Sequence, residues 1–256
     1  MSTVSSLVRQ VRWNQKTYWR NPAAAGFTFA FPLLFLVVFI AINGNDRVGV
    51  TGGRVKFAQF YVPAIAAFGL ISACYTNLGF SVTSLRERRI LKRVRGTPLS
   101  PIVYLSGLIG NAVVVSLILS SLVITLGVVV YGITFPDHYV GLAVSIVTGA
   151  FCFSALGIAV STFVPNEDAA PAIINFVLFP LLFISGTFGP ISSGSALSKV
   201  ATVFPMQHLN KLMQRVFNPF AAGTAIHSTD VALLILWGLV GVAVSVRRFR
   251  WEPNRI

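Results

Sequence analysis

The chain has 256 residues, of which 55% are apolar and only 11% charged, and its mean hydropathy is +0.77. Soluble domains are about 45–50% apolar and about 25% charged, so this composition excludes an ordinary soluble enzyme. The net charge of +13 does not indicate a nucleic-acid partner, because the basic residues lie between and beside apolar segments, as in the loops of membrane proteins.

Six apolar segments are long enough to cross a bilayer, which takes about 20 helical residues. Their centres contain no Asp, Glu, Lys or Arg, and they cover residues 23–43, 60–84, 102–131, 140–163, 169–188 and 231–246. The fifth is interrupted by Pro180, and the sixth is short. The sequence therefore predicts an all-α polytopic membrane protein with six transmembrane helices, forming a single domain over residues 1–256.

The distribution of Lys and Arg predicts the orientation of these spans. Residues 1–22, residues 85–101 and the C-terminal tail together contain fourteen cations, and the loops on the other side contain six. Cytoplasmic loops carry the excess of positive charge, so both termini are expected in the cytoplasm.

Residues 1–22 are expected to form an amphipathic helix on the inner membrane surface. Apolar residues recur at helical spacing, while Arg9, Arg12 and Lys16 occupy other faces, and Trp19 supplies an interfacial aromatic ring. The alternative is a charged tail that only fixes the topology.

Residues 85–96 are expected to form a short basic helix between the second and third spans. Ser84 and Glu87 have capping-box spacing, and Gly96 can end the helix. The simplest interpretation is a positively charged loop that holds the topology, and the alternative is a contact site for a cytoplasmic partner.

Residues 185–229 form a long connection between the fifth and sixth spans. Apolar residues between Met206 and Phe217 form one helical face, opposite His208, Lys211 and Arg215. This segment is expected to contain short external or re-entrant helices in the outer part of the membrane.

Three asparagines interrupt the apolar spans: Asn77, Asn111 and Asn175. An amide without a partner in hydrocarbon costs several kcal/mol, so each must face protein or a wet cavity. Hydrogen bonding between helices is one role. A path for cargo entering from the cytoplasm or the inner leaflet is the other.

Catalytic motifs are absent from the chain. It has no G-x-x-x-x-G-K-[ST] phosphate loop, no H-E-x-x-H and no G-x-S-x-G, and its three histidines are too scattered in sequence to predict a metal site. Ionisable residues are also missing from the span centres, which weakens a proton-driven carrier. What remains is a permease driven from outside the membrane.

The chain resembles the membrane subunits of ABC-2 type exporters, in particular the permeases of daunorubicin-type drug-resistance systems. Three stretches carry the resemblance: residues 86–100 after the second span, residues 175–186 (NFVLFPLLFISG) and residues 204–209 (FPMQHL). These motifs are degenerate and apolar, so the specificity comes from their order and spacing. The resemblance extends over nearly the whole chain.

The resemblance implies a translocating subunit without ATPase activity of its own. It would pair with a second permease, identical or homologous, and with separate ATP-binding subunits that carry ATP and Mg²⁺. Residues 1–22 would be the interface helix, and the coupling contact would involve Arg86, Glu87, Arg88, Arg89 and Leu91. No metal or cofactor is expected in this chain.

Drugs, antibiotics or other hydrophobic and lipidic compounds are the cargo expected from the same resemblance. Export of a lipid-linked polysaccharide is the alternative, and a carrier or channel without an ATPase is a further one. Arg outnumbers Lys 15 to 5, which suggests a GC-rich genome such as that of an actinobacterium. The expected location is the plasma or inner membrane of a bacterial cell, which the chain crosses several times.

Overall fold

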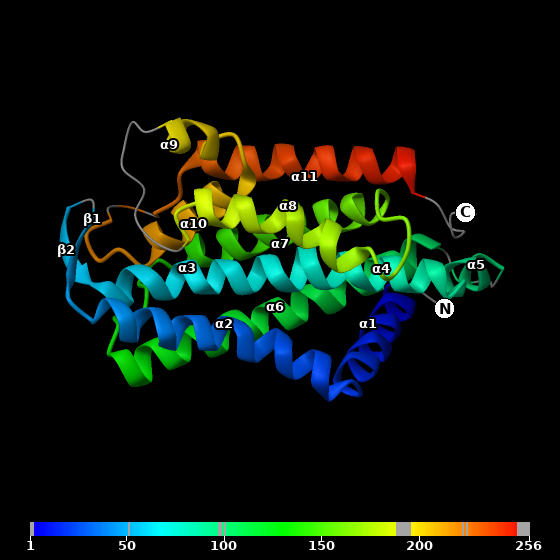
Figure 1. Cartoon of the computed structure of the whole chain (residues 1–256), viewed down its shortest axis with the longest axis horizontal. Coiled ribbons are helices and arrows are strands. Elements are labelled where there is room, and N and C mark those ends of the chain that lie inside the picture. Colours follow the sequence, from blue (N-terminus) through cyan, green and yellow to red (C-terminus); the bar gives the residue numbers. More distant parts are fainter. Residues whose placement is uncertain are drawn as a thin grey trace.

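The computed structural model describes residues 3–50, 52–96, 99, 101–187, 196–221, 223 and 225–249. Long helices run side by side along the molecule (Figure 1). They are α2 (Pro22–Asn43), α6 (Pro101–Tyr131), α7 (Tyr139–Ser161), α8 (Ala170–Ile184), α11 (Ser228–Arg248) and the composite α3 (Phe57–Ile71), η1 (Ser72–Thr76) and α4 (Asn77–Glu87). Shorter helices are α1 (Thr3–Trp19), α5 (Ile90–Arg95), α9 (Ala196–Ala201) and α10 (Pro205–Val216).

Five of the described helices are long and apolar enough to cross a membrane: α2, the composite α3–η1–α4, α6, α7 and α11. The predicted fifth span corresponds to α8, which has 15 residues and is therefore about 22 Å long. Pro180 lies inside α8, and the helix ends at Ile184, well before the predicted limit at residue 188. Residues 188–195 lie outside the described residues.

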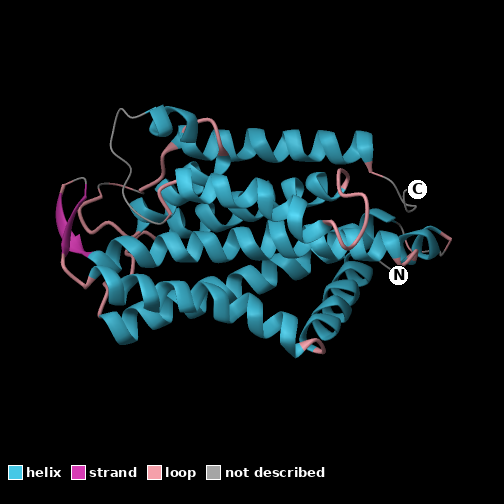
Figure 2. Cartoon of the chain, in the orientation of Figure 1, coloured by secondary structure: helices cyan, strands magenta, loops and turns pink. Residues whose placement is uncertain are grey.

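A two-stranded antiparallel hairpin corrects the all-α prediction (Figure 2). Strand β1 (Arg47–Val50) pairs with β2 (Gly53–Lys56), with Arg47 opposite Lys56 and Val50 opposite Gly53. In β1 two valines alternate with Arg47 and Gly49, and in β2 the single Val55 lies between Arg54 and Lys56. More buried and exposed positions alternate in both strands, a period of two that is typical of a half-buried strand. The hairpin lies at one end of the bundle, the hairpin end, while α1, α5 and the last turn of α11 lie at the other, the termini end (Figure 1).

The core of the bundle is built around the composite helix. Of the residues in α3, all but Phe60 are buried, and η1 adds a π-helical turn in the middle of the span. Gly157 of α7 packs against this turn, where a Cβ would lie 2.7 Å from the Tyr75 carbonyl oxygen. A π turn widens the helix locally, so only a glycine on the facing helix permits this close approach.

Two short helices occupy the connection between α8 and α11, as the sequence predicts. The predicted apolar face of α10 is buried, from Met206 (3% exposed) to Phe217 (2%). However, α10 packs inside the bundle, with Leu209 against the position of Gly149 on α7. His208, expected on the polar face, is buried as well.

Candidate functional site at the termini end

The predicted helix over residues 85–96 is divided in the structure. Helix α4 continues from the membrane span to Glu87, and Arg89 then adopts a left-handed conformation (φ 56°) before α5 begins at Ile90. Ser84 consequently lies inside α4 and is not its cap, so the predicted capping box is wrong. The first part of the basic segment therefore continues the membrane span as the end of α4, and the rest forms α5 after a turn at Arg88 and Arg89.

Two of the five predicted coupling residues are buried inside the chain. Arg86 is 3% exposed and donates hydrogen bonds to the carbonyl oxygens of Ser161 (3.0 Å) and Val164. Ser161 is the last residue of α7 and Val164 lies just beyond it, so the guanidinium supplies donors to carbonyls at the C-terminal end of the helix and in the turn that follows. Leu91 is fully buried, in an apolar cluster with Leu78 and Tyr104 among others. These two side chains therefore position α4 and α5.

The other three predicted coupling residues, Glu87, Arg88 and Arg89, are exposed. Arg88 Nη2 lies 2.9 Å from Glu167 Oε1, and Glu87 Oε2 accepts a hydrogen bond from the backbone N–H of Glu167. Ser84 Oγ donates to the same Glu167 oxygen at 2.9 Å. Glu167 thus joins the α4–α5 turn to the α7–α8 connection, residues 162–169.

Sequence reasoning missed Glu167, which is 79 residues from Arg88. Its hydrogen bond from Arg88, and then that from Ser84, lower the pKa of the carboxyl below its ordinary value of 4.5. The same connection contacts the end of α11, where the Arg248 guanidinium lies 4.7 Å from the centre of the Phe163 ring. A lone Glu and Asp in a loop without Lys or Arg was the only signal available in the sequence.

Helix α1 presents the four predicted membrane-surface residues to the outside. Arg9, Arg12, Lys16 and Trp19 are all exposed, and the Trp19 ring stacks on Phe29 with ring centres 5.4 Å apart. The opposite face packs on α6, where Gly107 and Gly110 face side chains of α1 directly. Helix α1 is therefore inclined against the bundle (Figure 1) and is not a free tail.

A cavity of about 780 Å³ lies between α1, α4, α5 and α6. Two of the three predicted path residues, Asn77 and Asn111, line it together, and Asn14 of α1 joins them. Asn14 Nδ2 and Asn111 Oδ1 are buried and have no hydrogen-bond partner. Asn175 lies on α8 and is not among the residues that line this cavity.

The coupling segment and the cavity meet at one place. Arg88 and Glu167 also line the cavity, so the ion pair between them stands at its margin. A partner that moved the α4–α5 turn would therefore act on the wall of this cavity, whose surface is mostly apolar although polar side chains also line it. This juxtaposition brings two sequence predictions, made from separate segments, into a single site.

The family model of the ABC-2 type transporter matches residues 7–218. The chain belongs to this family. Similar proteins are the inner membrane transport permeases YadH of Escherichia coli K12, Escherichia coli O157:H7 and Shigella flexneri, each 26% identical over 165 residues. The match covers 63% of this chain and 63% of each relative. With its five long apolar helices, this ABC-2 chain is a multi-pass protein of the bacterial inner membrane.

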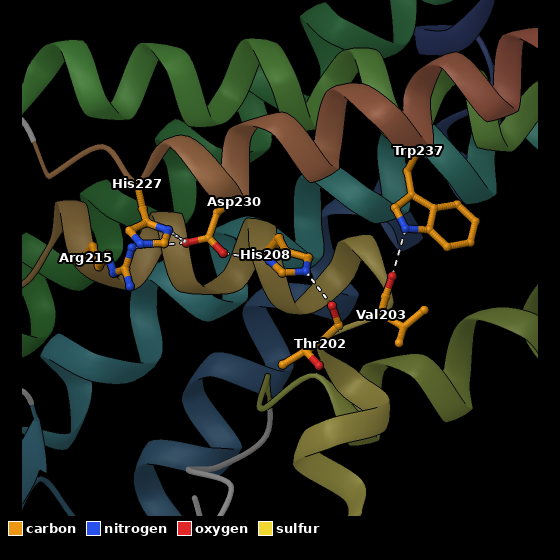
Figure 3. Close-up of polar contacts among 7 residues, drawn as sticks. All are labelled: Thr202, Val203, His208, Arg215, His227, Asp230 and Trp237. Atoms are coloured by element: carbon orange, nitrogen blue, oxygen red, sulfur yellow. Dashed lines mark hydrogen bonds and ion pairs between the residues drawn. The ribbon is translucent and has the colours of Figure 1, made fainter.

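A second polar cluster, drawn in Figure 3, lies where α10 meets the start of α11, at the opposite end of this ABC-2 chain (Figure 1). His208 Nδ1 is 2.6 Å from Asp230 Oδ1, and Arg215 and His227 each lie 3.1 Å from Asp230 Oδ2. His208 Nε2 faces the Thr202 carbonyl oxygen at 2.9 Å. Both ring nitrogens of His208 therefore face oxygen atoms, one of a carboxylate and one of a backbone carbonyl. The cluster joins α10 to the start of α11, although its histidines are scattered in sequence.

Proposed function

We propose that this chain is the translocating subunit of an ATP-driven exporter, with its termini end in the cytoplasm. The supporting observation is the exposed basic surface of the α4–α5 turn and α5, at the end of a span that lines a cavity containing buried amide groups. A separate ATP-binding subunit docks on Arg89, Lys92 and Arg93, which are exposed. Arg88 and Glu87 transmit the movement of this docking surface to the α7–α8 connection, because both contact Glu167.

Site-directed cross-linking to an ATP-binding subunit tests this docking surface. The native cysteines Cys74 and Cys152 are buried, so a thiol reagent reports an introduced exposed cysteine. Co-expressed with the ATP-binding protein of a neighbouring reading frame, Arg93→Cys should cross-link to it. Arg54→Cys, exposed in the hairpin at the other end, should not. Equal cross-linking at both positions, or none at position 93, would contradict the proposal.

The cargo in this proposal is a hydrophobic or amphipathic small molecule, a drug or a lipidic compound, that enters through the cavity at the termini end. The volume of this cavity, about 780 Å³, lies within the usual range of small-molecule sites, about 300–1,000 Å³. Asn77 and Asn111 supply polar groups in an apolar surround, and aromatic rings such as Tyr104 supply stacking surface. A second permease subunit completes the path across the membrane.

Matched asparagine variants separate a cargo path from simple hydrogen bonding between helices. Asn77→Ala with Asn111→Ala should change cargo-stimulated ATPase activity while the complex still assembles. Asn175→Ala, outside the cavity, should leave the cargo profile unchanged. A loss of thermal stability with an unchanged cargo profile in the double variant would assign these amides to helix packing alone.

A further inference from the structure

A second cavity, of about 740 Å³, lies at the hairpin end between the β1–β2 hairpin, α3, α10 and the loop that follows α10. Lys211 and Arg215 line it, and none of the described residues that line it is acidic. The two cations are four residues apart on α10, so they share one face of the helix. Like charges at this spacing repel each other, and an anion between them would remove the repulsion.

The two cations differ in what already neutralises them. Arg215 Nη1 lies 3.1 Å from Asp230, a carboxylate that also contacts His208 and His227. Lys211 makes no ion pair within the described part of the chain. Asp230 therefore fixes the Arg215 side chain beside the cavity, while the Lys211 ammonium is left with its full charge.

Two glutamines also line the cavity: Gln59 is held by hydrogen bonds, and Gln214 offers a free amide donor. Gln59 is 7% exposed, and its amide bonds to the Phe217 carbonyl (2.8 Å), the Thr134 carbonyl (3.2 Å) and the Thr134 N–H (2.8 Å). It thereby joins the start of α3 to two loops at this end. Gln214 also lines the cavity, and its Nε2 is buried without an acceptor.

The hairpin extends the positive field around the cavity. Its two strands carry three exposed cations, Arg47, Arg54 and Lys56, and no acidic residue. Arg54 pairs in register with Gly49, which lines the cavity. Several cations around one concave site attract anions and raise their local concentration.

We propose that this cavity binds the phosphate group of an anionic lipid headgroup, with Lys211 and Arg215 as its cationic ligands. A phosphodiester carries one negative charge and several acceptor oxygens, which matches two cations, one of them already paired with Asp230, and an amide donor. The hairpin end lies at one end of the helices that are long enough to cross a membrane, and a helix that crosses the hydrocarbon core ends near the lipid headgroups. This site is separate from the cargo cavity at the termini end.

Binding of short-chain lipids to the purified full chain in neutral detergent tests the proposal. Titration with short-chain phosphatidylglycerol should give tighter binding than phosphatidylcholine of the same chain length, and the difference should shrink as salt is added. Lys211→Gln should weaken phosphatidylglycerol binding about tenfold, the size expected for one charge-assisted contact. Lys211→Arg should keep it, and Lys199→Gln, an exposed cation of α9 outside the cavity, should not change it.

The outcomes distinguish the source of the anion. Inorganic phosphate that binds as tightly as phosphatidylglycerol would overturn the lipid assignment. Equal binding of both lipids, or equal loss in the Lys199→Gln and Lys211→Gln variants, would overturn the site itself and leave only diffuse positive charge. Melting curves of each variant without lipid establish that it is folded, and Arg215→Gln repeats the test at the second ligand.

Discussion

The two ionic clusters of this ABC-2 chain occupy opposite ends and differ most in exposure. The side chains of His208 and Asp230 are each 5% exposed, whereas those of Arg88 and Glu167 are 65% and 40% exposed. A buried pair that loses one partner leaves an uncompensated charge in the protein, while an exposed pair returns both groups to water. We therefore expect the buried pair of His208 and Asp230 to contribute more to stability than the exposed pair at the termini end.

Removal of Asp230 should lower the stability of the chain, because its carboxylate is buried, and an unchanged stability would contradict the difference between the two ends. Asp230→Ala leaves His208 and Arg215 without their carboxylate, and breaking a buried pair costs about 3–5 kcal/mol. We expect a large drop in the thermal midpoint and in the yield of the detergent-solubilised chain. Asp137→Ala, at an exposed aspartate before α7, is the matched control and should melt like the wild type.

Arg86 sharpens the comparison, because it lies at the termini end but is buried. Arg86→Met approximates the length of the side chain and removes the donors to the Ser161 and Val164 carbonyls, at about 1.5–3 kcal/mol for a hydrogen bond to a charged group. A clear decrease in thermal stability is expected. The exposed Arg89→Met should change stability by less than about 0.5 kcal/mol. Equal effects would mean that burial does not separate these two arginines.

Arg88 and Glu167 should show the reverse pattern, with a functional effect and little effect on stability. In a complex with the ATP-binding subunit, Arg88→Glu should lower transport per ATP hydrolysed while the complex still assembles. The swap Arg88→Glu with Glu167→Arg should restore part of the coupling, since it re-forms the pair in the opposite sense. Unchanged coupling in Arg88→Glu would show that the ion pair between Arg88 and Glu167 does not link ATP hydrolysis to transport.

The smallest expected effect is a pH dependence of the exposed link. The pKa of Glu167 is lowered in the folded chain, so its stabilising contribution is present above the ordinary value of 4.5 and is lost as the pH falls through the folded value. Melting curves between pH 6 and about pH 3 should therefore converge for wild type and Glu167→Gln at the acidic end. A constant difference between the two curves over this range would show that ionisation of Glu167 is not linked to stability, and coincident curves would show that Glu167 adds nothing to it.

Much of the architecture was predictable, because a membrane span is recognised from the hydropathy of consecutive residues and needs no knowledge of contacts between distant segments. Spans over residues 23–43, 102–131 and 140–163 match α2, α6 and α7 to within about two residues at each end. The α10 face was equally readable, since its apolar residues recur at helical spacing. Prediction was poorer for α8, which ends early, and for the hairpin, whose strands have only four residues each.

The sequence alone determined that this chain is a membrane protein of the ABC-2 type, because apolar length and the order of degenerate motifs need no tertiary contact. Only the tertiary structure decided which polar residues meet. Glu167 reaches Arg88 across 79 residues, and Asp230 reaches His208 across 22. It also turned Arg86 and Leu91 inward while leaving Arg89 exposed. The physical reason is that a helix has a pattern of faces, but the neighbour that covers each face is chosen by packing across the whole bundle.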